Sequence, residues 1–311
     1  MDSYLGPLAA LMSSFTWAVG VTAFTPLSKR HPAYIINLHR IFLALPSFLL
    51  ILVFNGQLSS AISSIVIHQV GWAAVAVLAS YAFGDVLFLM ATMRVGAPAA
   101  LAIASTYPVF AGLAGLLFRG EVLSLTRAIG ILVVIVGTIC VILSGPRSEA
   151  PISTVPRVQD DAHIRRRLRN PYITGILLAF GAAFCWALNT VAISGIGQGL
   201  DAISVNALRL SIALFLCPLI GIAMHGTRSF KLIPAREFLP ILPVFAVEAI
   251  AGPFFYVYGL SHSHLAIGAA LTSLAPVISV PFALLLGHEK FSWAKTLGVT
   301  AVVAGIWVML F

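Results

Sequence analysis

Four charged side chains lie inside long apolar stretches, where an ionised group is costly. Arg40 and Arg209 lie near the starts of two such stretches, and Asp85 and Glu248 lie deep inside two others. Charged residues in a membrane interior usually face one another or a water-filled cavity. At 1.5 Å of rise per residue, Arg40 lies about 10 Å and Asp85 about 13 Å from the cytoplasmic ends of their helices. The two side chains therefore lie at similar depth and can pair. We hypothesise that Glu248 and Asp85 take part in proton coupling or substrate binding; a satisfied polar contact between helices is the alternative.

The two arginines belong to a repeated motif, Asn37-x-x-Arg40 and Asn206-x-x-Arg209. Residues three apart share one face of a helix, so each Asn and Arg form a unit. Two interpretations stay open. In the structural one, each arginine snorkels or satisfies carbonyls of a neighbouring helix. In the functional one, each arginine is a cation that faces a substrate carboxylate or an internal acid.

Aromatic and polar residues occur in the same apolar stretches as these charges. A single aromatic residue in a membrane helix is usually packing or an interfacial anchor. As a set, they predict an amphipathic pocket for a small organic solute. The predicted cavity residues are Trp17, Tyr81, Tyr107, Trp186, Asn189, Tyr256 and Ser273.

Two prolines, Pro108 and Pro276, lie in the middle of apolar stretches. Proline frees a backbone carbonyl and kinks a helix. The kinks could act as points of rocking between open states, or could be purely geometric.

Catalytic, metal and cofactor motifs are absent from the sequence. It has no phosphate-binding loop, nucleophile elbow, HExxH or kinase motif, so ATP-driven transport and enzymatic catalysis are not expected. Cys140, Cys185 and Cys217 all lie in apolar stretches and form neither a disulfide framework nor a metal motif. We expect no catalytic residue, no metal and no cofactor.

The composition indicates what kind of structural element carries these charged and aromatic residues. Of 311 residues, 60% are hydrophobic and 9% are charged, and the mean hydropathy is +1.03. Soluble domains carry about 25% charged residues, so the chain is predicted to be an all-α, multi-pass membrane protein. Its net charge of +8 fits basic loops on one side of a membrane better than nucleic-acid binding. The opening residues lack a basic leader region, so the first span is expected to be retained.

Ten transmembrane helices are predicted from the apolar periodicity. Their expected ranges are 5–27, 33–54, 71–92, 97–118, 123–144, 172–195, 202–224, 238–260, 264–286 and 291–311. A polar stretch rich in Arg and Pro separates the fifth span from the sixth. This linker (145–171) divides the chain into a first repeat (1–144) and a second repeat (172–311).

The halves repeat each other at an almost constant offset. Adding 169 takes Trp17 to Trp186 and Arg40 to Arg209, and adding 168 takes Gly84 to Gly252. Each half holds an odd number of spans, so the copies must cross the membrane in opposite senses. Such inverted repeats are typical of secondary transporters, whose substrate site lies between the repeats. We expect the first, third, fourth, sixth, eighth and ninth spans to line it.

The loop charges predict the orientation. Nearly all loop Lys and Arg residues lie in the odd-numbered loops, and only Arg119 and Arg127 lie in even-numbered ones. The positive-inside rule therefore puts the 145–171 loop in the cytoplasm and both termini outside.

Glycines recur every seven residues in the last span of each half, at Gly130 and Gly137 and at Gly298 and Gly305. Such a face permits close helix contact, either with a neighbouring span or in a homodimer interface. Glu121 and Glu289 precede these spans and suit the positive end of the helix dipole.

Several of these repeated motifs resemble the drug/metabolite transporter superfamily, EamA type. The resemblance rests on Phe15-x-Trp17-Ala18 and Phe184-x-Trp186-Ala187, on the two arginines, on Pro108-Val109 and Pro276-Val277, and on the Glu…Gly…Gly series. It covers nearly all of the chain except the linker; Gly287-His288-Glu289 departs from the family pattern at His288.

The resemblance implies a ten-helix carrier of the bacterial inner membrane that moves small metabolites, often as an exporter of amino acids. The partners expected are a small-molecule substrate and membrane lipid, and no nucleic acid. We expect alternating access between the repeats, with or without proton coupling. The alternatives are a flippase for a lipid-linked or amphipathic substrate and, from another class, a non-transport membrane subunit or an intramembrane enzyme.

Overall fold

The computed structural model describes residues 4–28, 30–110, 124–143, 171–196, 200–226, 232–262, 271–275 and 292–308, with a few single residues and one pair between 268 and 285. The first half contains α1 (Leu5–Ser28), α2 (Ala33–Phe54), α3 (Leu58–Ser63), α4 (Ile67–Val77), the π-helical turn η2 (Leu78–Ala82), α5 (Gly84–Val95), α6 (Ala97–Ala104) and α8 (Leu125–Leu143). The second contains α9 (Pro171–Ile196), α10 (Ala202–His225), α11 (Ala235–Phe238), η4 (Leu239–Ile241), α12 (Leu242–Ala246), the π-helical turn η5 (Val247–Ala251), α13 (Gly252–Ser261) and α16 (Trp293–Val308).

These elements follow the expected spans, and the all-helical prediction is confirmed. Five helical stretches among the described residues are long and apolar enough to cross a bilayer, namely 33–54, 67–95, 171–193, 202–223 and 235–261. The third span begins at Ile67, four residues before the expected start, and the short α3 precedes it. The linker up to residue 170, Glu121, Glu289, Pro276 and most of the ninth span lie outside the described residues.

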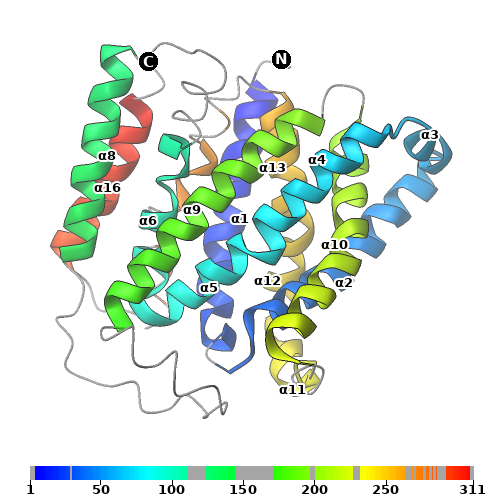
Figure 1. Ribbon diagram of the computed structural model, residues 1–311, viewed down its shortest axis with the longest axis horizontal. Helices are drawn as coiled ribbons and strands as arrows, with labels where there is room; N and C mark the ends of the chain where they lie inside the picture. The colour runs from blue at the N-terminus through cyan, green and yellow to red at the C-terminus, as the bar shows by residue number, and fades with distance from the viewer. Residues whose placement is uncertain are drawn as a thin grey trace.

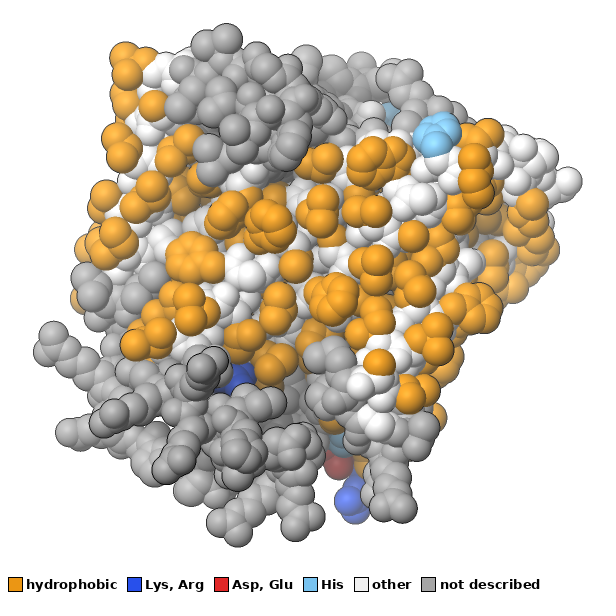
Figure 2. All heavy atoms as spheres, in the orientation of Figure 1, with side chains coloured by type: hydrophobic (Ala, Val, Ile, Leu, Met, Phe, Trp, Pro, Cys, Tyr) orange, Lys and Arg blue, Asp and Glu red, His pale blue; other side chains and the backbone are white. Residues whose placement is uncertain are grey.

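Apolar side chains cover the outside of the molecule. Leu132, Phe215 and Leu219 are each more than 60% exposed, on α8 and α10. Figure 2 shows such side chains over most of the described surface of one face, with the few visible Lys, Arg, Asp and Glu toward the lower end of the view. An exposed apolar surface of this extent suits contact with lipid.

The two halves run in opposite directions and interleave. In Figure 1, α1 descends from the end where the chain begins, whereas α9 rises from the opposite end. The first helix of each half packs against the third span of the other half, α1 on α13 and α9 on α4 and α5. The equivalent helices α2 and α10 pair, as do α8 and α16. The arrangement confirms the two inverted repeats.

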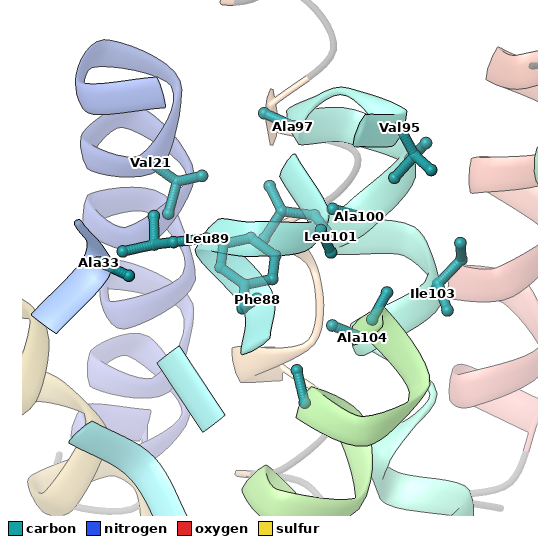
Figure 3. Packing of buried hydrophobic residues seen from close by; sticks show 14 of the residues in the cluster. Val21, Ala33, Phe88, Leu89, Val95, Ala97, Ala100, Leu101, Ile103 and Ala104 are labelled. Carbon is teal, nitrogen blue, oxygen red and sulfur yellow. The ribbon is translucent and has the colours of Figure 1, made fainter. Parts of the chain in front are cut away.

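The largest apolar cluster joins helices of both halves. Val21 of α1, Phe88 of α5 and Leu101 of α6 are buried in it, as is Ala179 of α9. Figure 3 shows its first-half members lying side by side. The small residues of α6 bring its backbone close to α5 and α9, because alanine adds little side-chain volume between helices.

Both third spans are interrupted at corresponding places. The turns η2 and η5 differ by 169 in residue number, and each leads into a helix that begins with glycine, Gly84 or Gly252. A π turn breaks the regular backbone ladder and is frequent at functional sites. A Cβ on Gly84 would contact the Ala79 carbonyl oxygen and lie 2.9 Å from Cδ1 of Trp186, so glycine allows this helix to meet α9. No pattern in the sequence predicted these turns.

Asp201 defines the start of α10. Its carboxylate accepts hydrogen bonds from the backbone N–H groups of Ile203 at 2.8 Å and Ser204 at 3.0 Å, and from the Ser204 hydroxyl at 2.7 Å. Partial burial opposes ionisation, but these hydrogen bonds outweigh it and lower the pKa of Asp201 below its ordinary value. The cap ends the short connection to α9 and so places the Asn206-x-x-Arg209 motif one turn inside the helix.

The repeated glycines bring α8 and α16 together within one chain. A Cβ on Gly137 would lie 2.5 Å from the Val302 nitrogen and 2.8 Å from the Gly298 oxygen. A Cβ on Gly305 would lie 2.6 Å from the Val134 nitrogen and 2.7 Å from the Gly130 oxygen. The structure shows these glycines at a contact with a neighbouring span.

Adding a methyl group at this contact should destabilise the protein. We expect Gly137→Ala to cost about 1–3 kcal/mol, because the new Cβ meets backbone atoms that cannot move aside. The measurement is the midpoint of thermal unfolding in detergent. Gly71→Ala is the matched control, because a Cβ there meets nothing within 4 Å and its midpoint should be unchanged or higher. Equal midpoints for Gly137→Ala and the unaltered protein would contradict this account of the packing.

Candidate functional site: a charged cavity between the repeats

A cavity of about 130 Å³ lies between the two halves, and both contribute to its walls. Its walls come from the six spans expected from the sequence and also from α2 and α10, which supply Arg40 and Arg209. The lining residues are Ser13, Trp17, Arg40, Ser80, Tyr81, Asp85, Leu101, Ser105, Tyr107, Trp186, Asn189, Arg209, Glu248, Gly252, Pro253, Tyr256, Thr272 and Ala275.

Arg40 is held by two carboxylates from different halves. Its Nε and Nη2 donate to the two carboxylate oxygens of Glu248, at 3.0 and 2.6 Å. Its Nη1 donates to Asp85 at 2.5 Å and to the Asn37 side-chain oxygen at 3.1 Å. The Arg40, Asp85 and Glu248 side chains are 7%, 7% and 1% exposed. With both acids ionised, this group, here called the Arg40 triad, holds one excess negative charge.

Aromatic rings enclose the triad. The Arg40 guanidinium lies 5.1 Å from the Trp17 ring centroid and 5.4 Å from that of Tyr81. Trp186 donates its indole N–H to Asp85 at 3.1 Å, and its ring lies 5.7 Å from that of Trp17. The two tryptophans are equivalent residues of the two repeats, so the pseudo-symmetry axis passes close to the triad. Rings of this kind stabilise a buried cation and exclude water from it.

Arg209 lies on the same cavity in different surroundings. Its Nη2 donates to the Asn189 side-chain oxygen at 3.1 Å and to the Ser80 hydroxyl at 3.4 Å. Its guanidinium lies 5.9 Å from the Tyr81 ring centroid, so Tyr81 lies near both arginines. Among the described residues, no carboxylate forms an ion pair with it.

The asparagine of each Asn-x-x-Arg motif binds backbone near the π turn of its own half. Asn37 donates to the Tyr81 carbonyl at 2.6 Å, inside η2. Asn206 donates to the Pro253 carbonyl at 3.1 Å, just beyond η5. The motif therefore has two parts: the asparagine satisfies carbonyls of the interrupted third span, and the arginine faces the cavity.

The cavity is also lined by hydroxyl groups. Tyr107 hydrogen-bonds to Thr272 at 2.6 Å and also to Ser273, and Tyr256 hydrogen-bonds to Thr190 at 2.9 Å. Ser273 is buried behind Tyr107 and does not itself line the cavity. Pro108 follows Tyr107 directly and is half-buried.

Four small polar residues of the wall were not predicted from the sequence: Ser13, Ser80, Ser105 and Thr272. Serine and threonine are common in membrane helices, where they bond their own backbone, so type alone does not single them out. Within the described part of the chain, His, Cys, Asp and Glu form no group of three that could hold a metal ion.

Comparison with known proteins agrees with this architecture. The profile of the EamA-like transporter family matches residues 4–143 and 173–311, so the chain belongs to this family of membrane transporters. An "Uncharacterized transporter" of Methanothermobacter thermautotrophicus is 24% identical over 75% of this chain, and "Uncharacterized transporter YvbV" of Bacillus subtilis is 27% identical over 66%. The chain spans 62% and 60% of those two proteins' own length.

Two further similarities extend over the whole chain. An "Uncharacterized transporter" of Archaeoglobus fulgidus is 22% identical over 97% of both proteins. A crystal structure with 18% sequence identity superposes with a TM-score of 0.63 over 99% of this chain and 94% of its own. At that identity the likeness shows a shared fold.

Removing Arg40 should leave two buried carboxylates unpaired. We expect Arg40→Met to lower the free energy of unfolding by about 3–5 kcal/mol, the cost of breaking a buried ion pair from one side. The matched control is the triple variant Arg40→Met, Asp85→Asn, Glu248→Gln, which has no stranded charge and should recover much of the loss. Thermal unfolding in detergent measures both. A triple variant as unstable as Arg40→Met would show that the loss of stability comes from altered packing and not from unpaired charge.

Proposed function

We propose that this protein is a secondary transporter that exports small organic metabolites, such as amino acids, by alternating access between its two inverted repeats. The observation that carries the proposal is the charged cavity lined by both halves, because a site between repeats can open to either side when one half rocks against the other. A non-transport subunit would not require charged residues around a shared internal space.

The interrupted third spans are the places where such rocking can occur. Each π turn lies at the cavity, with Ser80 and Tyr81 in η2 and Glu248 in η5. The close α8–α16 contact lies at the side of the molecule, away from these turns (Figure 1). We infer that the α8–α16 pair acts as a rigid scaffold and that the spans around η2 and η5 move.

Proton coupling at Glu248 is part of the proposal. Glu248 is 1% exposed and bonds Arg40 through both carboxylate oxygens. The Arg40 triad holds two acids for one cation, so one proton can neutralise its excess charge. Protonation would also weaken the Glu248–Arg40 pair, which joins η5 of one half to α2 of the other. A proton can therefore change how firmly the halves are held together.

The size of the cavity favours a small solute over a lipid. Its volume of about 130 Å³ is close to that of an engineered cavity of about 150 Å³ that binds benzene. An occupant of about six heavy atoms fits this conformation.

Transport should be measurable in proteoliposomes. We expect purified protein to move at least one labelled amino acid or related metabolite, at a rate that responds to an imposed pH gradient. Glu248→Gln, which keeps the size of the side chain but cannot carry the proton, should abolish the response to the gradient at unchanged protein abundance. Empty liposomes are the control for leakage. Full, gradient-dependent activity in Glu248→Gln and Glu248→Ala would remove this residue from the coupling mechanism.

We further propose a bacterial inner membrane location, with the 145–171 loop in the cytoplasm and both termini outside. The excess of Lys and Arg in the odd-numbered loops supports this orientation. The start of α1 and the end of α16 lie at the same end of the molecule in Figure 1, as an even number of spans requires.

A reporter fused to the C-terminus tests this orientation. Alkaline phosphatase, which is active only outside the cytoplasm, should be active when fused after residue 311 and inactive when inserted in the 145–171 loop. Green fluorescent protein at the same two positions should give the opposite pattern. Fluorescence at the C-terminus would reverse the assignment.

A further inference from the structure

The two equivalent arginines of the repeats differ in what neutralises them. Adding 169 takes Arg40 to Arg209, and Ser80 and Glu248 lie in the equivalent π turns η2 and η5. Each arginine contacts the π turn of the other half: Arg40 contacts Glu248 of the second half, and Arg209 contacts Ser80 of the first. The equivalent π turns thus provide a carboxylate to one arginine and a hydroxyl to the other.

The polar groups of Arg209 are incompletely satisfied. It is 3% exposed, and its Nε has no hydrogen-bond partner within the described part of the chain. The buried side-chain oxygen of Asn206 also lacks one there, although the equivalent Asn37 oxygen accepts from Arg40 at 3.1 Å. A guanidinium has five N–H donors, and a buried donor without an acceptor is costly. Arg209 is therefore a cation on the cavity wall with unused donor capacity.

We propose that Arg209 is the anion-recognition residue of the cavity and that it binds a carboxylate of the transported solute. This inference rests on the proposed transport function. The bound carboxylate would take the role toward Arg209 that Glu248 takes toward Arg40, where Nε and Nη2 each bond one carboxylate oxygen. That two-point geometry is the preferred one between a guanidinium and a carboxylate.

The charges of the cavity match a carboxylate on a small solute. Arg40 is already paired with two acids, which leaves Arg209 as the arginine available to an anion among the described cavity residues. A single cation matches a single negative charge better than a doubly charged phosphate group. A solute that also carries an ammonium group can direct it toward the excess negative charge of the Arg40 triad, which leaves the occupied cavity neutral.

The test compares amino acids with derivatives that lack the carboxylate. Labelled alanine, alaninamide and ethylamine, and the same three forms of larger amino acids, are offered to the protein in proteoliposomes. We expect the protein to transport or bind the carboxylate forms and to discriminate against the amides and amines by at least about tenfold. Tenfold corresponds to about 1.4 kcal/mol, within reach of one charge-assisted hydrogen-bonded pair.

Two kinds of variant connect this preference to Arg209. Arg209→Gln should reduce binding of the carboxylate forms by at least about tenfold and abolish the discrimination. Ser80→Glu keeps Arg209 but places beside it the carboxylate that Glu248 supplies to Arg40, so it should compete with the solute and cause a similar loss. Ser80→Gln is its matched control in size, and the loss with Glu should exceed that with Gln by about tenfold. Because Ser80→Glu pairs a buried charge, it tests the proposal even if Arg209→Gln folds poorly.

The outcomes separate this inference from the transport function. Equal transport of amides, amines and carboxylate forms would overturn the role of Arg209 and leave transport intact. Equal effects of Ser80→Glu and Ser80→Gln would also overturn it. Movement of no solute in either direction would contradict transport itself, and the assignment of Arg209 with it.

Discussion

The pairing of Arg40 with Asp85 and Glu248 is the interaction on which the centre of the molecule depends. None of these three charges could remain in an apolar interior alone, since each would carry the full cost of leaving water. Together they bring α2, the start of α5 and η5 to one point between the halves. Trp186 of α9 and Trp17 of α1 close the group from two sides. The need to neutralise one buried cation thus determines where five spans meet.

Symmetry and its local loss have different roles in this protein. The Asn-x-x-Arg motifs, the π turns and the following glycines occur in both halves and build the same framework twice. The charges placed on that framework are not repeated, since η2 presents the Ser80 hydroxyl to Arg209 and η5 presents the Glu248 carboxylate to Arg40. A duplicated scaffold can be stable with either residue, because a hydroxyl and a carboxylate both accept from arginine. The difference leaves one arginine neutralised from within and the other facing the cavity.

Packing changes from the side of the molecule to its centre. At the α8–α16 contact, glycine faces bring two backbones within van der Waals distance and leave no room for an added methyl group. At the centre, serine, threonine, tyrosine and tryptophan side chains surround open space. Close backbone packing resists deformation, whereas interrupted helices around a polar cavity can change conformation at lower cost. This distribution fits a rigid frame around a moving centre.

Much of the architecture follows from the sequence because it depends on local chemistry. Apolar length defines the spans, the offset between halves defines the repeat, and an odd number of spans in each half requires the inversion. The same reasoning selected Trp17, Tyr81, Tyr107, Trp186, Asn189 and Tyr256, all of which line the cavity. The depths of Arg40 and Asp85 along their helices also indicated, from the sequence alone, that the two side chains could pair.

Only the tertiary structure decided which groups meet across the halves. Helix arithmetic gives depth but no direction around the helix axis, so it could not show that Glu248 bonds Arg40 or that Arg209 is left with Ser80 and Asn189. Nor could it show that η2 and η5 depart from the α-helix, since contacts with neighbouring helices stabilise the irregular backbone of a π turn. The sequence determines a membrane protein of two inverted halves with charges inside. The fold decides which charge is neutralised and which stays open, because that depends on distances of a few ångströms between distant parts of the chain.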